Sequence, residues 1–166
     1  KCVRRSTFGH STKTARIFLF PIPTVTAAMC MPRCWSGSGR DTKYFLGKGY
    51  DVEATDGSKE LCKIAGEYAG VQVKQMLFEE LDAVEEYDGV WACASILHVE
   101  KKQLPDILGK IAAATKKGGV VYTSFKYGDF EGVRNGRFFT YLTEESFGEL
   151  VKEIPNLAVE KLWVSA

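Results

Sequence analysis

The chain has 166 residues and a mass of 18.4 kDa, which is enough for one domain with a substantial core. Its 45% hydrophobic and 26% charged residues exclude a disordered chain, a coiled coil and a disulfide framework. The charge is uneven, because residues 1–40 carry seven Lys or Arg and no acid, while residues 41–166 carry 15 basic and 21 acidic side chains. Such a step marks a tail, a targeting segment or foreign sequence joined to a domain.

The cysteines and apolar runs bear on location and metal binding. Five cysteines, at positions 2, 30, 34, 62 and 93, include no CxxC pair, which favours reduced thiols in a cytoplasmic protein. With only two histidines in the chain, the spacing of Cys30 and Cys34 is too poor for structural zinc, so we expect no metal. The apolar run at 17–25 is short and interrupted by two prolines, so we expect no membrane-spanning segment.

From residue 41 onward, helical and strand patterns alternate with short loops. The strand patterns cover residues 50–56, 71–76, 87–94, 120–125 and 157–165. The helical patterns cover residues 42–48, a segment capped by Ser58, residues 103–116 and a segment capped by Thr143. The expected apolar stripes are Leu61, Ile64, Ala65 and Tyr68 in the second helix, Leu104, Ile107, Leu108, Ile111 and Ala112 in the third, and Phe147, Leu150 and Val151 in the last. This order predicts an α/β fold with a doubly wound, mostly parallel sheet that helices cover on both faces.

A pair of glycines precedes the first of these helices. In a sheet of this type, ligands bind at the carboxyl ends of the strands, and the first strand-to-helix loop is usually rich in glycine. Here the loop runs Gly37-Ser38-Gly39-Arg40-Asp41. Glycines let the backbone approach a ligand where a Cβ would collide, and the following helix adds free N–H groups and a partial positive charge. The loop is a candidate cofactor site, although the same spacing also fits a simple turn.

An acidic residue strengthens the case for a cofactor. Asp56 ends the next predicted strand, 17 residues after Gly39, where a carboxylate can accept hydrogen bonds from both hydroxyls of a ribose. Together the loop and the acid predict a nucleoside-containing cofactor. A dinucleotide site needs a third small residue in the loop, whereas this sequence continues with Arg40, Asp41 and Thr42, so NAD is disfavoured.

These residues resemble a known family. The segments GSGRDTKYFLGKGYDVEATDGS, QMLFEEL, EYDGVWACASILHV, KKGGVVYTSFKYG and GRFFTYLTEESF follow one another in the chain. In this order they resemble class I S-adenosylmethionine-dependent methyltransferases, in particular small bacterial ones similar to tellurite-resistance methyltransferases. The resemblance covers about residues 36–165 and implies a Rossmann-like fold, S-adenosylmethionine as cofactor and transfer of a methyl group. It says little about the acceptor.

The resemblance also implies where the cofactor binds. The implied cofactor-binding residues are Gly37, Ser38, Gly39, Asp56, Gly57, Leu77, Phe78 and Ala94. The methionine part of the cofactor lies beside the glycines, Asp56 holds the ribose, and Leu77 and Phe78 flank the adenine. An apolar pair after a strand fits plain core packing equally well.

The methyl acceptor is expected next to the methionine end of the cofactor. The candidate acceptor-binding residues are Ser95, His98, Arg137 and Tyr141. Ser95 also suits a turn cap, and Tyr141 also suits the core. His98 lines the acceptor pocket or acts as a base in one interpretation, and is a packed, hydrogen-bonded residue in the other. Lys126, Arg134 and Arg137 can bind an anionic acceptor or form a solvated basic loop.

The N-terminal part departs from the family pattern, in which an acid and three alternating glycines follow the first strand. Arg33 stands in place of the acid, Trp35 in place of the first glycine, and Pro32 where a central strand should donate a hydrogen bond. We therefore predict that residues 1–35 are foreign to a domain formed by residues 36–166. The alternative is a presequence, because the segment is basic, rich in Ser and Thr and free of acids.

The other end of the chain also looks short. The family's seventh strand lies antiparallel between the fifth and the sixth, and this chain stops just after the sixth. We expect that strand to be missing, which leaves a gap or an unpaired edge unless the N-terminal segment or another chain fills it. An exposed edge would favour self-association.

The expected function is methyl transfer from S-adenosylmethionine to a small-molecule acceptor in the cytoplasm. The acidic balance of residues 41–166 makes nucleic acid a poor acceptor, and no membrane partner is expected. No catalytic residue is assigned, since positioning and desolvation supply most of the acceleration in this reaction. Two alternatives remain: a non-catalytic methyltransferase-like domain, whose loop Arg33 and Trp35 damage, and an NAD-dependent oxidoreductase.

Overall fold

A β-sheet lies at the centre of the molecule. The computed structural model describes residues 14–18, 28–30 and 39–165. Over these residues the strands are β1 (Thr14–Phe18), β2 (Ala28–Cys30), β3 (Ala54–Asp56), β4 (Val73–Gln75), β5 (Tyr87–Ala92), β6 (Thr115–Tyr127), β7 (Glu131–Arg134), β8 (Arg137–Leu142) and β9 (Lys161–Ser165). Their order across the sheet is β4-β3-β2-β5-β6-β1-β9, and β8 pairs with β7 and with the end of β6.

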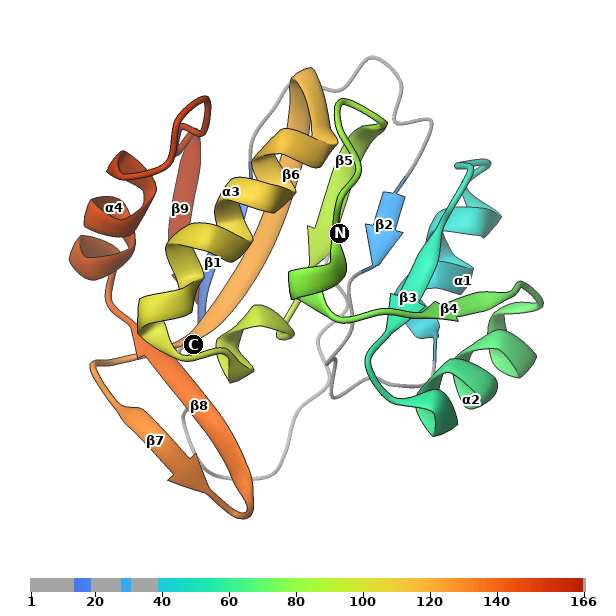
Figure 1. The fold of residues 1–166 in the computed structure, drawn as a ribbon, viewed down its shortest axis with the longest axis horizontal. Helices are drawn as coiled ribbons and strands as arrows, with labels where there is room; N and C mark the ends of the chain where they lie inside the picture. The colour runs from blue at the N-terminus through green and yellow to red at the C-terminus, as the bar shows by residue number, and fades with distance from the viewer. Residues whose placement is uncertain (1–13, 19–27, 31–38, 166) are drawn as a thin grey trace.

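The strand directions establish the fold class. β4, β3, β2, β5 and β6 run parallel, whereas β1 runs antiparallel between β6 and β9. From β2 the chain moves outward through β3 to β4, and it then returns to the other side of β2 to form β5 and β6 (Figure 1). This reversal confirms the predicted Rossmann-like, doubly wound, mostly parallel sheet. Ligands bind such sheets beside the reversal, at the carboxyl ends of the strands.

Helices cover both faces of the sheet. The α-helices of the described residues are α1 (Arg40–Gly47), α2 (Lys59–Ala69), α3 (Leu104–Ala114) and α4 (Glu144–Lys152), and the 3-10 turns are η1 (Phe78–Glu80), η2 (Ile96–His98) and η3 (Lys101–Gln103). In Figure 1, α3 and α4 lie in front of the sheet and α1 lies behind it. This double cover explains why β5 has the near-continuous apolar sequence of a strand buried on both faces.

The predicted helix caps are confirmed. Ser58 Oγ accepts a hydrogen bond from the N–H of Leu61 (3.4 Å) at the start of α2. Thr143 Oγ1 accepts one from the N–H of Ser146 (3.2 Å), while Ser146 Oγ accepts one from the N–H of Thr143 (2.9 Å). This reciprocal pair satisfies two backbone donors at the start of α4, so the helix begins where the sequence indicated.

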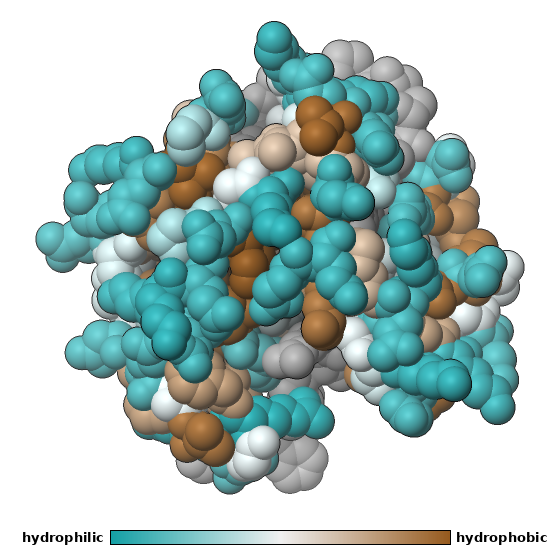
Figure 2. All heavy atoms as spheres, in the orientation of Figure 1, coloured by the Kyte–Doolittle hydropathy of each residue, from teal (hydrophilic) through white to brown (hydrophobic). Residues whose placement is uncertain are grey.

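Burial of α3 and α4 also follows the sequence. The α3 stripe lies in the core, although Ala112 is only partly buried, and the α4 stripe is buried as predicted. Figure 2 shows hydrophilic side chains over most of the opposite, outward face of these helices. The apolar stripes alone therefore account for how α3 and α4 dock on the sheet.

The predicted apolar stripe of α2 is confirmed at Ala65, partly buried at Leu61, and wrong at Ile64 and Tyr68. Ile64 and Tyr68 are 51% and 47% exposed, and the buried residues of the helix are Cys62 and Ala65. The reason is a close approach of backbones, because a Cβ at Gly39 would lie only 2.7 Å from the carbonyl oxygen of Ala65. Small side chains have to face such a contact, so the larger apolar residues of α2 turn away from it.

Two strands come from the segment that the sequence sets apart. β2 lies between β3 and β5, where the resembled family has its first strand, and β1 lies between β6 and β9. The expected gap beside β6 is therefore filled by residues 14–18, which is the alternative that the sequence left open. Arg33 and Trp35 lie outside the described residues. The foreign origin of residues 1–35 and self-association stay predictions.

The β7–β8 hairpin replaces the solvated basic loop of one interpretation. Its strands pair antiparallel with Arg134 opposite Arg137. The two residues between them, Asn135 and Gly136, both have positive φ, at 51° and 74°. A two-residue turn with positive φ at both positions matches the twist of paired strands, and Asn-Gly is its preferred sequence. The signal for this hairpin was thus present in the sequence and was overlooked.

Strand ends differ from the prediction more than strand positions do. β3 starts at Ala54 and not at residue 50, β9 starts at Lys161 and not at 157, and β6 extends over Thr115–Tyr127 in place of 120–125. Pairing with a neighbouring strand decides where a strand begins. Side-chain alternation cannot report that pairing.

Candidate functional site

The carboxyl ends of the parallel strands meet along one edge of the sheet, at the bottom of Figure 1. Asp56 at the end of β3 lies in register with Gln75 at the end of β4, and Ala92 at the end of β5 lies in register with Thr123 of β6. We call this the carboxyl edge. Helix α1 starts immediately after Gly39, and the helix that follows the first predicted loop belongs to this edge in a doubly wound sheet.

Gly39 is constrained on two counts. Its φ of 70° lies in the left-handed region, and a Cβ there would meet the Ala65 carbonyl oxygen at 2.7 Å. Its own carbonyl oxygen accepts the N–H of Lys43 (2.9 Å), which closes the first turn of α1. Only glycine satisfies both conditions without displacing a helix. Gly37 and Ser38 lie outside the described residues.

Asp56 is buried at the end of β3 and held in place. Its Oδ1 accepts a hydrogen bond from the N–H of Ser58 (2.8 Å), which closes a turn at Gly57. Its carbonyl oxygen accepts the N–H of Met76 (3.1 Å) and the thiol of Cys62 (3.2 Å). Burial raises the pKa of the Cys62 thiol and the negative charge of Asp56 raises it further, so this thiol remains a donor at neutral pH. The acid thus stands at a rigid position, as a ribose-binding carboxylate needs.

The apolar pair after β4 is divided between the core and the surface. Phe78 is 4% exposed and belongs to the hydrophobic core, which agrees with the core-packing interpretation of this residue. Leu77 is 42% exposed, and its N–H donates to Glu80 Oε2 (2.7 Å) within turn η1. Of the two, only Leu77 has an exposed side chain that can pack against a flat ring such as adenine.

A strained turn follows β5. Ala94 has a φ of 48°, a left-handed conformation that costs a residue with a Cβ about 1–2 kcal/mol. Its N–H donates to Ser124 Oγ on β6 (2.8 Å), which holds the turn. The next residue, Ser95, is 0% exposed, and its hydroxyl has no hydrogen-bond partner among the described residues. Backbone strain and unsatisfied buried polar groups concentrate at functional sites, and here the two occur side by side at the carboxyl edge.

His98 is buried under the β7–β8 hairpin. Its Nδ1 lies 2.7 Å from the carbonyl oxygen of Phe138, so this nitrogen carries the proton and donates. Its ring also packs against Phe139, with centroids 4.7 Å apart. This geometry matches the packed, hydrogen-bonded histidine of the second interpretation, and it fixes the position of β8 above the turn after β5.

Two more hydrogen bonds fasten the hairpin. Thr140 Oγ1 donates to the carbonyl oxygen of Val99 (2.7 Å) in a buried contact. The N–H of Lys101 donates to Glu131 Oε1 (2.8 Å) at the surface. These bonds join the hairpin to the segment after β5, and together the two form one side of the carboxyl edge.

Two of the predicted acceptor residues lie on this hairpin. Tyr141 is half-buried and pairs with Lys126 at the end of β6. Arg137 is exposed at the hairpin tip opposite Arg134. The register thus places Tyr141 beside the sheet and Arg137 away from it.

The sequence reasoning missed a contact that anchors the start of α1. Trp91 Nε1 donates to Asp41 Oδ2 (3.0 Å), and the indole stacks on Tyr122 with centroids 3.8 Å apart and an interplanar angle of 12°. Phe45 packs edge-on against the same indole at 5.2 Å. Asp41 and Trp91 are 50 residues apart in the chain, and no short-range pattern links two such positions. The contact fastens the helix that follows Gly39 to the strand that precedes Ala94.

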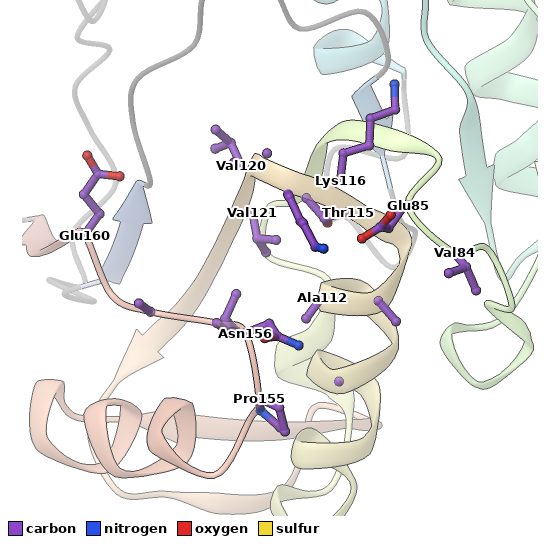
Figure 3. Close-up of a pocket in the computed structure, with 17 residues that line it drawn as sticks. Val84, Glu85, Ala112, Thr115, Lys116, Val120, Val121, Pro155, Asn156 and Glu160 are labelled. Atoms are coloured by element: carbon purple, nitrogen blue, oxygen red, sulfur yellow. The ribbon is translucent and has the colours of Figure 1, made fainter.

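A hollow of about 830 Å³ opens at the other end of the sheet (Figure 3). Its walls are the end of α3, the start of β6 and the chain after α4, with Thr115, Lys116, Val120 and Asn156 among the lining residues. These are the amino ends of the parallel strands. Because a doubly wound sheet binds its cofactor at the carboxyl ends, this hollow is separate from the site at Asp56 and Ala94.

Other features of the described chain bear on the earlier expectations. Residues 14–18, 28–30 and 39–165 contain no helix with the length and apolarity needed to cross a membrane. In the same residues no group of three His, Cys, Asp or Glu gathers as a metal site. Cys62 and Cys93 take part in no disulfide.

The sequence matches a family model described as a methyltransferase domain over residues 34–119. This match spans just over half of the chain and includes the glycine loop, β3, β5 and the turn at Ala94. The chain therefore belongs to the methyltransferase-domain family, as the resemblance implied, and not to the NAD-dependent oxidoreductases. No curated protein sequence matches it.

Solved structures share the fold. The 1,6-didemethyltoxoflavin-N1-methyltransferase of Burkholderia thailandensis, with bound 1,6-didemethyltoxoflavin and S-adenosylhomocysteine, has a TM-score of 0.61 at 24% identity, over 77% of this chain and 58% of that one. An S-adenosylmethionine-dependent methyltransferase of Leishmania major has a TM-score of 0.65 at 19% identity, over 77% and 54%. A TehB-like methyltransferase of Corynebacterium glutamicum has a TM-score of 0.58 at 16% identity, over 79% and 65%. The chain thus spans less than two thirds of each of these proteins.

Family membership implies S-adenosylmethionine as the cofactor, and the residues at the carboxyl edge fit it. Gly39 keeps backbone bare at the start of α1, and Asp56 presents a carboxylate at the end of β3. The strained Ala94 follows β5 on the same edge, and so does Ser95, whose hydroxyl has no partner in the part of the chain that the structure describes. These are the positions at which a nucleoside, its charged tail and a reacting group are bound in a doubly wound sheet.

Proposed function

We propose that the chain is the methyltransferase domain of an enzyme that moves a methyl group from S-adenosylmethionine to a small-molecule acceptor. The observation that carries this proposal is that the family match covers Asp56, Leu77 and Ala94, which end or follow β3, β4 and β5 at the carboxyl edge. The acidic balance of residues 41–166 argues against a nucleic-acid acceptor. A cytoplasmic location stays a prediction from the reduced cysteines.

The residues divide into two groups in this proposal. Gly37, Ser38, Gly39, Asp56, Gly57, Leu77, Phe78 and Ala94 hold the cofactor. Ser95, His98, Arg137 and Tyr141 belong to the acceptor side, where Ser95 and His98 act from buried positions and Arg137 lies at the hairpin tip. Phe78 contributes from the core, as support for the turn that carries Leu77. His98 acts by positioning the hairpin through its hydrogen bond to Phe138.

When bound, the cofactor supplies a methyl group on a positively charged sulfur, which a nucleophile can attack directly. The chain contributes orientation and exclusion of water, which can supply most of the acceleration. Asp56 and Gly39 orient the two ends of the cofactor, and the hairpin fastened by Thr140 covers the acceptor side. No general acid or base is required for a nucleophile that is already unprotonated.

Calorimetric titration with S-adenosylhomocysteine tests the proposal. We expect the unaltered chain to bind it and Asp56→Asn to bind it about 10- to 100-fold more weakly, because a hydrogen bond to a charged group contributes about 1.5–3 kcal/mol. The asparagine still offers an oxygen to the N–H of Ser58, so the local turn is kept.

Asp88→Asn is the matched control. It removes a charge from the amino end of the sheet, where Asp88 forms an ion pair of 3.1 Å with Lys116, and it should leave the affinity unchanged. Absence of binding by the unaltered chain would support the non-catalytic alternative. Equal weakening by both variants would remove the assigned role of Asp56.

A further inference from the structure

A row of aromatic rings with a cation at each end runs from the end of β6 onto the β7–β8 hairpin. Phe130 packs edge-on against Tyr141 with centroids 5.4 Å apart, and Tyr141 packs edge-on against Phe139 at 6.2 Å. Lys126 Nζ lies 4.4 Å from the Phe139 centroid and 5.6 Å from that of Tyr141. Arg134 Cζ lies 3.8 Å from the Phe130 centroid and 5.5 Å from that of Tyr141. We call these five residues the aromatic–cation row, and Tyr141 is the ring that both cations share.

The rings orient these cations without neutralising them. Among the residues that the structure describes, Lys126 and Arg134 form no ion pair. The quadrupole of a ring holds a cation with about 0.5–1 kcal/mol at an exposed site and leaves its charge in place. The carboxylate of Glu131 on β7 accepts a hydrogen bond from the N–H of Lys101. The row therefore presents two oriented positive charges in a domain that is acidic overall, and each can form a stronger, charge-assisted hydrogen bond with an anion.

The row lies close to the strained turn. Lys126 is two residues beyond Ser124 on the same face of β6, a separation of about 7 Å along a strand. Ser124 Oγ accepts the N–H of Ala94, where the proposed function places the reacting end of the cofactor. A single aromatic ring bridges a distance of this order. A ligand held at Lys126 can thus present its far side to the turn.

We propose that the acceptor is a small aromatic or heteroaromatic acid, whose carboxylate binds Lys126 and whose ring packs against Tyr141. This inference rests on the proposed function and names the acceptor class for it. Because Lys126 holds the carboxylate about 7 Å along β6 from the turn at Ala94, the methyl group goes to a second nucleophile on the far side of the same molecule, an amine, ring nitrogen or hydroxyl. The lone pair of that atom forms the bond to the methyl carbon and the electron pair of the broken carbon–sulfur bond stays on sulfur. A proton released by the acceptor passes to water.

Three probes separate charge from ring in a calorimetric titration of the chain saturated with S-adenosylhomocysteine. Benzoate has both features, benzamide has the ring without the charge, and acetate has the charge without the ring. We expect benzoate to bind at least about tenfold more tightly than either of the others. Equal affinity for benzoate and benzamide, or no benzoate binding by a chain that binds S-adenosylhomocysteine, would overturn the inference and leave the proposed function standing. Failure to bind S-adenosylhomocysteine would refute both.

Variants locate the binding. Lys126→Gln should weaken benzoate binding about tenfold or more, and Arg134→Gln, at the other end of the row, should weaken it less. Both variants should keep their affinity for S-adenosylhomocysteine, which also shows that they fold. Lys126→Arg keeps the charge and should retain binding. Lys48→Gln is the matched control, because Lys48 Nζ also lies over a ring, 5.5 Å from the Tyr44 centroid, at the far end of α1. Unaltered benzoate affinity in Lys126→Gln would contradict the site.

Discussion

Replacing Gly39 with alanine probes the contact that brings α1 and α2 together at the carboxyl edge. The substitution has two costs. A residue with a Cβ at a φ of 70° loses about 1–2 kcal/mol, and the Cβ would lie 2.7 Å from the Ala65 carbonyl oxygen. Relieving an overpacked contact of this kind costs a further about 1–3 kcal/mol, because a backbone oxygen cannot turn aside as a flexible side chain can. The expected loss in free energy of unfolding is therefore about 2–5 kcal/mol.

A matched glycine separates these two costs. Gly70, at the end of α2, has a φ of 78°, and a Cβ there would meet no atom within 4 Å. Gly70→Ala should therefore lose only the conformational part, about 1–2 kcal/mol, when both variants are unfolded in urea. Only Gly39→Ala should also weaken binding of S-adenosylhomocysteine, since α1 has to move away from α2. Equal losses of stability in the two variants would show that the close approach at Ala65 does not exist and would refute the reasoning.

Two further substitutions test contacts at the carboxyl and amino ends of the parallel strands. Thr140→Val preserves shape but leaves the carbonyl of Val99 without its buried donor, so urea unfolding should show a loss of about 1–3 kcal/mol, and an unchanged midpoint would contradict the fastening of the hairpin. Tyr87, whose hydroxyl donates to Glu53 Oε2 (2.9 Å), has its pKa raised, first by burial and then by this hydrogen bond and the charge of Glu53. Because the folded pKa lies above the unfolded value of about 10, the stabilisation is complete below pH 10 and declines as the pH rises above it. Tyr87→Phe should flatten this alkaline decline, and an identical slope in both proteins would show that Tyr87 does not cause it.

Local signals in the sequence were reliable where the physics that produces them is local. The caps at Ser58 and Thr143 and the stripes of α3 and α4 depend on residues within four positions of one another, and each is confirmed. Asp56 was identified for a similar reason, because an acid that ends a strand is visible from its neighbours alone. The Asn135-Gly136 turn belongs to the same category, because its signal lies in two adjacent residues.

The α2 stripe shows where local reasoning ends. By periodicity alone Ile64 and Tyr68 are core residues, yet both are exposed because the neighbouring helix approaches at Gly39. Phe78 and Leu77 illustrate the same limit. They are adjacent and both apolar, yet turn η1 begins at Phe78, so Phe78 is buried and Leu77 is exposed. Burial depends on which element lies opposite, and a single segment carries no record of that.

The amino-acid sequence by itself determined the fold class, the order of helices and strands from residue 41 apart from the β7–β8 hairpin, and the membership of a methyltransferase family. The tertiary structure decided which distant residues meet. It placed residues 14–18 beside β6, joined Asp41 to Trp91, set His98 under Phe138, and lined up Lys126 and Arg134 along one row of rings. The physical reason is that caps and periodicity arise from hydrogen bonds and burial within one or two turns of chain. Contacts between residues 30 to 50 positions apart arise only when whole elements pack, and their energies depend on geometry that no short pattern encodes.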